Sequence, residues 1–177
     1  MTSESGEPVP KAKNPVTPGK MNEPIQVVEF VLGNEHFAID LFDVKEVVEY
    51  TTITKLPNVP SYVKGIIDLR GEITMIIDLK HRLNITEETR TSIELSRIMV
   101  LDDRIAKSKT GILVDDVTSV STFEPNFVDY TSASVSREET SIIGIIKRKA
   151  RVKDKEINEL IIWIDIRQLL GDIDSPA

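Results

Sequence analysis

The sequence predicts an all-β protein built from two similar small β-barrel units. Gly-Ile-Ile opens a strand, a turn and a second strand at residues 65–67 and again at residues 144–146, and the two units close on Asp78 and Asp165. Short β-prone segments recur at regular intervals along the rest of the chain. Aromatic residues make up only 5% of the sequence, so Ile, Val and Leu must form most of the core. Ile and Val are β-branched and suit a pleated sheet.

The composition divides the 177 residues into one folded region and two tails. Residues 1–24 combine five prolines with glycines and small polar residues, which predicts a disordered Pro-rich N-terminal tail. We expect the folded region to span residues 25–172, which leaves residues 173–177 as a short C-terminal tail.

The elements before the first repeat are expected to be mainly strands. Ile25–Leu32 and Glu35–Asp40 have strand patterns and flank a Gly-Asn turn. Apolar residues then recur at spacings of three and four, which predicts a short helical turn over residues 41–48: Leu41, Val44, Val47 and Val48. Residues 51–55 are β-prone, and the two prolines that follow in residues 56–60 mark a corner.

The hairpins account for most of the remaining chain. The first repeat is a hairpin over residues 65–78 closed at Arg70-Gly71, where Gly71 supplies the positive φ of a tight turn. We expect a helical turn at residues 79–83, a loop over residues 84–95, and a second hairpin. The segments of that hairpin and of the second repeat are Arg97–Asp102, Gly111–Asp115 and Ser141–Leu170. Residues 124–139 are polar and are predicted to be irregular.

The similarity between the two halves extends upstream of the hairpins. Val31-Leu32 and residues 43–47 precede the first Gly-Ile-Ile, as Val100-Leu101 and residues 116–120 precede the second. This order indicates a duplicated β unit.

The sequence offers no candidate for catalysis. It has no cysteine, and its two histidines, His36 and His81, lie on different expected elements. No metalloprotease, nucleophile-elbow or Walker motif is present. Asp78 and Asp165 occupy equivalent positions, where an N-cap explains each better than an acid/base pair. We therefore expect no enzymatic activity, no catalytic residue, no metal site and no cofactor.

Charge also limits the classes of partner. The net charge of −7 counts against a nucleic-acid-binding protein. Residues 147–155 nevertheless form a basic stretch, which we interpret as a solvated loop at the turn of the second hairpin. Contact with anionic lipid, an acidic partner or nucleic acid stays open for that stretch. No signal peptide opens the chain and no apolar run reaches ~18 residues, so we expect a soluble cytoplasmic protein without direct membrane insertion.

Two sets of residues admit two interpretations from the sequence alone. Arg70 is either a turn arginine paired with a neighbour such as Asp68 or Glu72, or an exposed forked donor for a partner. A set of four aliphatic residues either belongs to the core or lines a groove between the two units: Leu41, Val44, Val47 and Val117.

Several blocks in register resemble the CheW family of chemotaxis coupling proteins, over about residues 25–172. They are Phe30-Val31-Leu32-Gly33, Phe37-Ala38-Ile39-Asp40, Val44-Lys45-Glu46-Val47, Thr54-Lys55-Leu56-Pro57-Asn58-Val59-Pro60, Gly65-Ile66-Ile67-Asp68-Leu69-Arg70-Gly71 and Ile76-Ile77-Asp78-Leu79. The resemblance implies a coupling domain of two SH3-like five-stranded β-barrels sharing a hydrophobic core, with short helical turns.

The same resemblance implies a non-enzymatic scaffold. Family members couple methyl-accepting chemoreceptors to the histidine kinase CheA in arrays at the inner face of the cytoplasmic membrane. It implies binding to the regulatory domain of CheA, to the cytoplasmic receptor tip and to other CheW copies. The matching kinase-binding residues are Arg70, Glu46, Asp68 and Gly71, and those of the receptor-binding groove are Leu41, Val44, Val47 and Val117.

Three departures from the family pattern affect the choice of partner. Asp68 stands where the family usually has Asn, the second hairpin has a longer basic turn over residues 148–159, and the Pro-rich tail is an addition. They favour, as an alternative, an adaptor for a non-chemotaxis or alternative receptor-kinase array. A CheV-like adaptor would require a receiver domain after the coupling domain, and the sequence given ends at Ala177.

Overall fold

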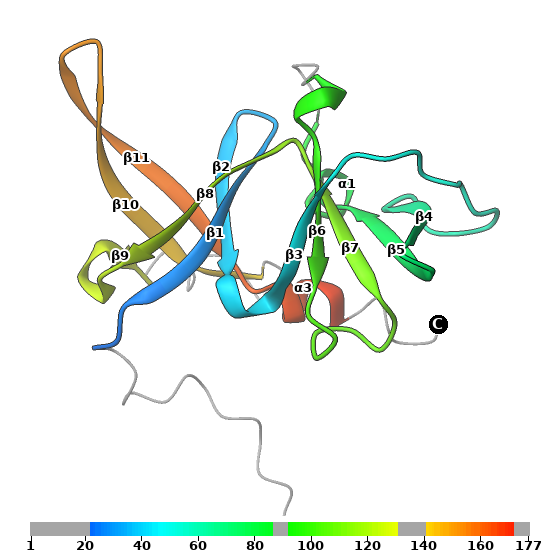
Figure 1. Cartoon of the computed structure of the whole chain (residues 1–177). Helices are drawn as coiled ribbons and strands as arrows, with labels where there is room; N and C mark the ends of the chain where they lie inside the picture. The colour runs from blue at the N-terminus through cyan, green and yellow to red at the C-terminus, as the bar shows by residue number, and fades with distance from the viewer. Residues whose placement is uncertain (1–21, 87–91, 131–140, 172–177) are drawn as a thin grey trace, which may run out of the picture.

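The computed structural model describes residues 22–86, 92–130 and 141–171, which form two packed β-sheets with short helices (Figure 1). The predicted tails lie almost entirely outside the described residues. The six-stranded sheet has the order β8-β1-β2-β11-β10-β9, and the five-stranded sheet has the order β3-β6-β7-β5-β4. The all-β prediction is confirmed, although one sheet gains a sixth strand of two residues.

The strands of the six-stranded sheet are β1 (Ile25–Leu32), β2 (Glu35–Asp40), β8 (Asp116–Phe123), β9 (Val128–Asp129), β10 (Ile142–Val152) and β11 (Lys155–Ile164). Those of the five-stranded sheet are β3 (Val44–Glu49), β4 (Val63–Leu69), β5 (Glu72–Asp78), β6 (Arg97–Leu101) and β7 (Thr110–Val114). The helical segments are η2 (Leu41–Asp43), α1 (Leu79–Arg82), η3 (Ile93–Leu95), η4 (Pro125–Phe127) and α3 (Ile166–Gly171).

The two halves of the chain exchange strands between the sheets. β1 and β2 lie in the six-stranded sheet, whereas β3, β4 and β5 lie in the other; the corresponding strands of the second half do the reverse. Each repeat hairpin joins its sheet through one parallel pair, β5 with β7 and β11 with β2. The repeat read from the sequence is therefore a repeat of strand order, and neither sheet is built from one half alone.

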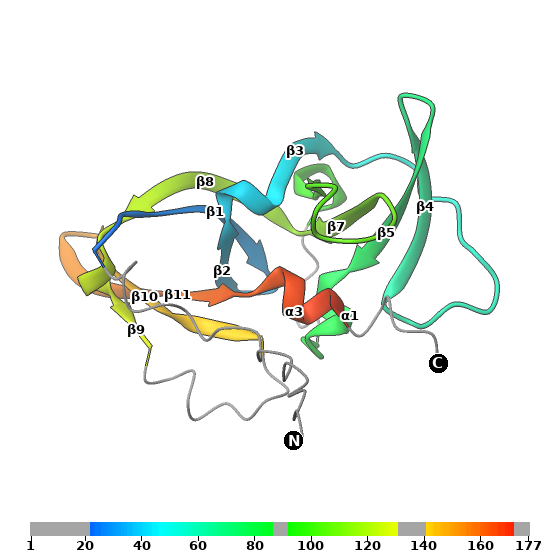
Figure 2. The same cartoon turned by 90° about the horizontal axis from the view of Figure 1, so that it is seen from below.

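One apolar core joins the sheets. Its buried members come from both sheets and from the two helices that follow the repeat hairpins: Val28, Phe30, Leu32, Phe37, Ile39, Ile77, Leu79, Met99, Leu101, Ile112, Val114, Ile164, Ile166, Leu169 and Leu170. Asp78 caps α1 by accepting hydrogen bonds from the amides of Lys80 and His81. Asp165 does the same at the start of α3, so the predicted N-caps are confirmed. In Figure 2, α1 and α3 both lie on the side of the picture away from β3 and β8.

The helical turn predicted over residues 41–48 is wrong beyond residue 43. Only η2 is helical, and β3 begins at Val44 and pairs antiparallel with β6. Burial along β3 alternates residue by residue, as in a strand with one face on the core. The apolar spacing resembled a helix because the four aliphatic positions are divided between two elements, with Leu41 in η2 and Val44, Val47 and Val48 in β3. Residues 51–55 form only an isolated bridge, between Thr54 and Ile66.

The solvated loop predicted at residues 147–155 is also wrong. β10 and β11 pair without interruption from Lys147 opposite Leu160 to Val152 opposite Lys155. The turn is confined to Lys153 and Asp154, whose φ angles of 48° and 61° are those of a two-residue hairpin turn. The prediction treated a highly charged segment as a loop because charged side chains need solvent. A two-stranded hairpin also exposes its side chains to solvent, so it can be regular despite a high charge.

Candidate functional site

Arg70 lies at the exposed tip of the β4–β5 hairpin. Leu69 pairs with Glu72, so Arg70 and Gly71 are the two turn residues, with φ angles of 53° and 84°. Both angles are in the left-handed region that this turn requires. The left-handed backbone conformation costs an arginine about 1–2 kcal/mol, because its Cβ crowds the following carbonyl oxygen and glycine has no Cβ. The pairing of β4 with β5 holds Arg70 in this conformation at the tip of the hairpin.

Glu46 on β3 holds the Arg70 guanidinium from across the sheet. Arg70 Nη1 donates to Glu46 Oε1 at 3.1 Å and Nη2 donates to Oε2 at 2.9 Å, which is the bidentate geometry that arginine favours. The Arg70 side chain is 73% exposed and that of Glu46 is 25% exposed. Such an exposed pair adds little to stability, but it fixes the direction of a guanidinium whose other N–H groups face solvent.

The acidic neighbours of Arg70 in the sequence contact other groups, the Gly71 amide for Asp68 and Lys109 for Glu72. Asp68 Oδ1 accepts a hydrogen bond from the Gly71 amide at 2.7 Å and so closes the turn. Glu72 lies 2.8 Å from Lys109 Nζ. The structure therefore brings Arg70, Glu46, Asp68 and Gly71 together at one tip. It also adds Ile73, which is 62% exposed and opposite Asp68. Strand alternation after the turn was the signal that could have identified Ile73.

The four aliphatic residues of the expected groove divide into two groups. Leu41, Val44 and Val117 are half-buried and pack against the shared core. Val47 is 42% exposed on the outer side of β3. Val120, at the equivalent position on β8, is 63% exposed. The set thus lies at the margin of the core.

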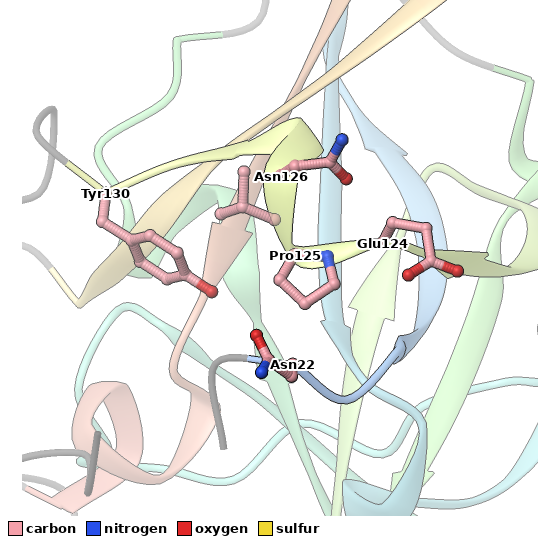
Figure 3. A pocket seen from close by; sticks show the side chains of 6 residues that line it. Asn22, Glu124, Pro125, Asn126 and Tyr130 are labelled. Carbon is pink, nitrogen blue, oxygen red and sulfur yellow. The ribbon is translucent and has the colours of Figure 1, made fainter. Parts of the chain in front are cut away.

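A hollow lies at one end of the six-stranded sheet. It encloses about 520 Å³ between the start of β1 and the segment that contains η4 and β9 (Figure 3). Its lining is Asn22, Glu124, Pro125, Asn126, Val128 and Tyr130. In Figure 3 the Tyr130 side chain points across the hollow toward Asn22. This lining contains no cation, and we assign it no chemistry.

A buried ionic cluster, missed by the sequence analysis, ties β10 to β1. Glu29 is fully buried, and Arg148 Nη1 lies 2.8 Å from its Oε1. Ser119 and Ser121 also donate to Glu29, and Arg148 donates to Glu159 at 2.6 Å. Burial raises the pKa of Glu29, but these hydrogen bonds and the Arg148 charge outweigh burial and leave that pKa below its ordinary value. The cluster thus pairs the buried Glu29 carboxylate with a cation and ties β10 to β1.

The described residues show neither a metal site nor a membrane span. Across residues 22–86, 92–130 and 141–171, no three His, Asp or Glu side chains are grouped to hold a metal ion. No helix in this part of the chain is long and apolar enough to cross a membrane.

Known proteins match most of the chain. The family model of the CheW-like domain matches residues 26–174. The chemotaxis protein CheW of Treponema pallidum is 38% identical over 101 residues, covering 56% of this chain and 58% of that protein. The probable chemotaxis protein CheW of Rhizobium etli is 26% identical over 156 residues, covering 86% and 91%. The crystal structure of the scaffolding protein TtCheW from Thermoanaerobacter tengcongensis matches with a TM-score of 0.66 and 32% identity, covering 84% of this chain and 93% of that one.

Proposed function

Because the chain belongs to the CheW-like family of chemotaxis scaffold proteins, we propose that it couples chemoreceptors to the histidine kinase CheA. The exposed guanidinium of Arg70, held by Glu46, is the observation that carries this proposal. The protein acts without catalysis, as a cytoplasmic adaptor recruited to receptor arrays at the inner face of the membrane.

The kinase contact is the Arg70 tip. A pre-oriented arginine loses less side-chain freedom on binding than a mobile one, and arginines are frequent energetic centres of interfaces. Asp68 and Gly71 keep the turn closed, and Ile73 offers an exposed aliphatic surface on the same hairpin. The complementary surface is the regulatory domain of CheA, presenting a carboxylate or backbone carbonyls to Arg70.

The receptor contact is the margin between the two sheets. Leu41, Val44 and Val117 pack on the core with part of their surface exposed, and Val47 extends the apolar surface outward. An amphipathic receptor helix needs an apolar strip of this kind. On this proposal, Val47→Glu weakens binding of a receptor tip fragment and leaves kinase binding intact. Equal losses for both partners would contradict the assignment.

Calorimetric titration into the CheA regulatory domain of the same genome tests the kinase contact. Wild-type protein should bind at micromolar concentration, and Arg70→Glu should lose about tenfold or more, since a charge-assisted anchor is removed and reversed. Lys55→Glu, at an exposed position in the connection between β3 and β4, makes the same change in charge and should bind as wild type. Unchanged affinity of the Arg70 variant, with both variants folded, would refute the role of Arg70.

The second candidate function is that of an adaptor in a non-chemotaxis or alternative receptor-kinase array. The β10–β11 hairpin favours this candidate. The basic segment that departs from the family pattern is a regular, exposed structure. Absence of CheA binding by the folded wild type would point to that alternative, in which the adaptor serves another receptor-kinase pair.

A further inference from the structure

The outer half of the β10–β11 hairpin projects from the six-stranded sheet as a free arm, formed by residues 147–160. β9 pairs with β10 only at Ile145 and Ile146, and β2 pairs with β11 only at residues 161–163. Beyond those positions the described strands pair only with each other. Six residues per strand at about 3.4 Å each give an arm roughly 20 Å long. Figures 1 and 2 both show its tip at the periphery of the molecule.

The arm has the opposite charge to the rest of the protein. Residues 147–160 hold six cations and three carboxylates, a formal charge of +3, which leaves −10 for the remainder of a chain with a net charge of −7. The cations are also ordered. Lys147, Lys149 and Arg151 alternate along β10 and so lie on one face. Arg148 between them points to the buried Glu29, so the three exposed cations lie on the other face of β10. Lys147 lies 3.4 Å from Asp129 and Lys149 lies 3.5 Å from Glu156, and such exposed ion pairs are weak enough for an incoming carboxylate to replace.

The two strands of the arm differ in charge. β10 carries Lys147, Lys149 and Arg151 on one face, whereas β11 carries Glu156 on that face, opposite Arg151, and Glu159 on the other face, opposite Arg148. Over residues 147–152 no described strand other than β11 pairs with β10, so half of its backbone hydrogen-bonding groups are open to a further strand. Exposed edges of this kind recruit extended segments by strand addition.

We propose that the β10 edge of the arm, residues 147–152, binds an extended acidic protein segment as an added β-strand. The backbone of the segment would pair with β10, and its carboxylates at alternate positions would lie beside Lys147, Lys149 and Arg151, where cross-strand neighbours are within about 5.5 Å. Its intervening side chains would be aliphatic, because the other face of the arm exposes Val152 at 51% and Ile157 at 44%. This surface lies on the opposite sheet from Arg70 and does not depend on the proposed function.

Other occupants fit these observations less well. A second copy of the arm would bring cations opposite cations, which destabilises cross-strand pairs. Residues 147–160 contain no aromatic side chain on which bases could stack. A membrane or a long nucleic acid would also approach the rest of the chain, whose formal charge is −10. A short acidic strand needs contact only with the arm, and it uses the open backbone edge that lipids and nucleic acids cannot.

The test uses the full chain and a labelled eight-residue peptide in which Glu alternates with Val. Fluorescence polarisation measures binding, and amide hydrogen exchange locates it. We expect a dissociation constant of about 1 mM or tighter, weakening with added salt because the contacts are exposed. Slowed exchange should be confined to residues 147–152. The variant Lys147→Gln/Lys149→Gln/Arg151→Gln should bind roughly tenfold more weakly, as expected for the loss of several exposed pairs.

Two controls separate strand addition from simple charge attraction. Lys55→Gln/Lys64→Gln/Lys107→Gln removes three exposed cations outside the arm and should bind as wild type. A peptide with Pro at a central Val should lose binding, since proline cannot donate to the ladder. Equal binding of the proline peptide, or no binding at about 1 mM protein, overturns the proposal. So does tighter binding of a single-stranded oligonucleotide or of phosphatidylserine vesicles than of the peptide.

Discussion

Replacing Arg148 by Met would leave a buried carboxylate without its cation. The Glu29 side chain is fully buried, and its ion pair with Arg148 spans 2.8 Å. The same guanidinium donates to Glu159. Methionine keeps an unbranched apolar stem at this position, so the substitution mainly removes the charge and the hydrogen bonds.

The expected loss of stability follows from the burial of the two partners. Removing one partner of a buried ion pair costs about 3–5 kcal/mol. Here the Arg148 side chain is 34% exposed, so water can reach the site, and the hydroxyls of Ser119 and Ser121 still donate to Glu29. We therefore expect the free energy of unfolding to fall by about 2–4 kcal/mol. For a chain of this size the melting temperature should fall by roughly 5–15 °C.

The pH dependence has a definite sign. The pKa of Glu29 is lowered in the folded protein from an ordinary value of 4.5. A carboxyl group with a lowered pKa stabilises the fold above its unfolded-state pKa and loses that contribution as the pH falls through the folded-state pKa. The difference between wild type and Arg148→Met should therefore be largest at pH 7 and should shrink below about pH 4.5, where Glu29 can be neutral.

Urea unfolding at pH 7 and pH 4 measures both effects. Glu29→Gln and the Glu29→Gln/Arg148→Met double variant complete a thermodynamic cycle, and the double variant should recover part of the loss because no buried charge remains. Lys149→Met, at a 76% exposed position on the same strand, is the matched control and should change stability by less than about 0.5 kcal/mol. An Arg148→Met loss below about 1 kcal/mol, or one that is equal at both pH values, would refute this account of the cluster.

Three further substitutions test the turns and close contacts. Gly65→Ala should destabilise the fold by more than about 3 kcal/mol in urea unfolding, because its φ of +148° suits glycine and the new Cβ would clash with the Thr54 carbonyl oxygen. A small effect would mean that the backbone at Thr54 can move to make room for the Cβ. Gly71→Ala meets no neighbour and should cost only about 1–2 kcal/mol, from its φ of +84°; a larger loss would reveal a contact absent here. Replacing Lys153-Asp154 by Asn-Gly should slow amide exchange in the arm and leave the melting temperature unchanged, because Asn-Gly prefers this turn; faster exchange would contradict the turn type.

Local sequence rules predicted what depends on neighbouring residues. The Arg70-Gly71 turn, the caps at Asp78 and Asp165, and the strands at residues 25–32 and 35–40 all follow from patterns within a few positions. The same rules failed at residues 44–48, because four aliphatic positions at mixed spacings fit a helix as well as a strand. Pairing of β3 with β6 decided between them, and that partner lies about 50 residues away.

The site shows the same division. The sequence placed Arg70 at an exposed tip, but its residues alone left the partner open, and the flanking acids Asp68 and Glu72 were the local candidates. The resemblance to known proteins pointed to Glu46, and the structure supplies the contact across 24 residues of chain. Ile73 became visible only once the turn fixed which face of β5 is exposed.

The sequence by itself determined the β class, the repeated hairpin and the family, because turn residues, alternation and motif order are properties of the chain. The tertiary structure alone decided the exchange of strands between the two halves, the burial of Glu29 against Arg148, and the regular arm at residues 147–160. These features depend on pairing between segments that are distant in the sequence. They also depend on which side chains the two sheets bury away from water, and neither property can be read from neighbouring residues.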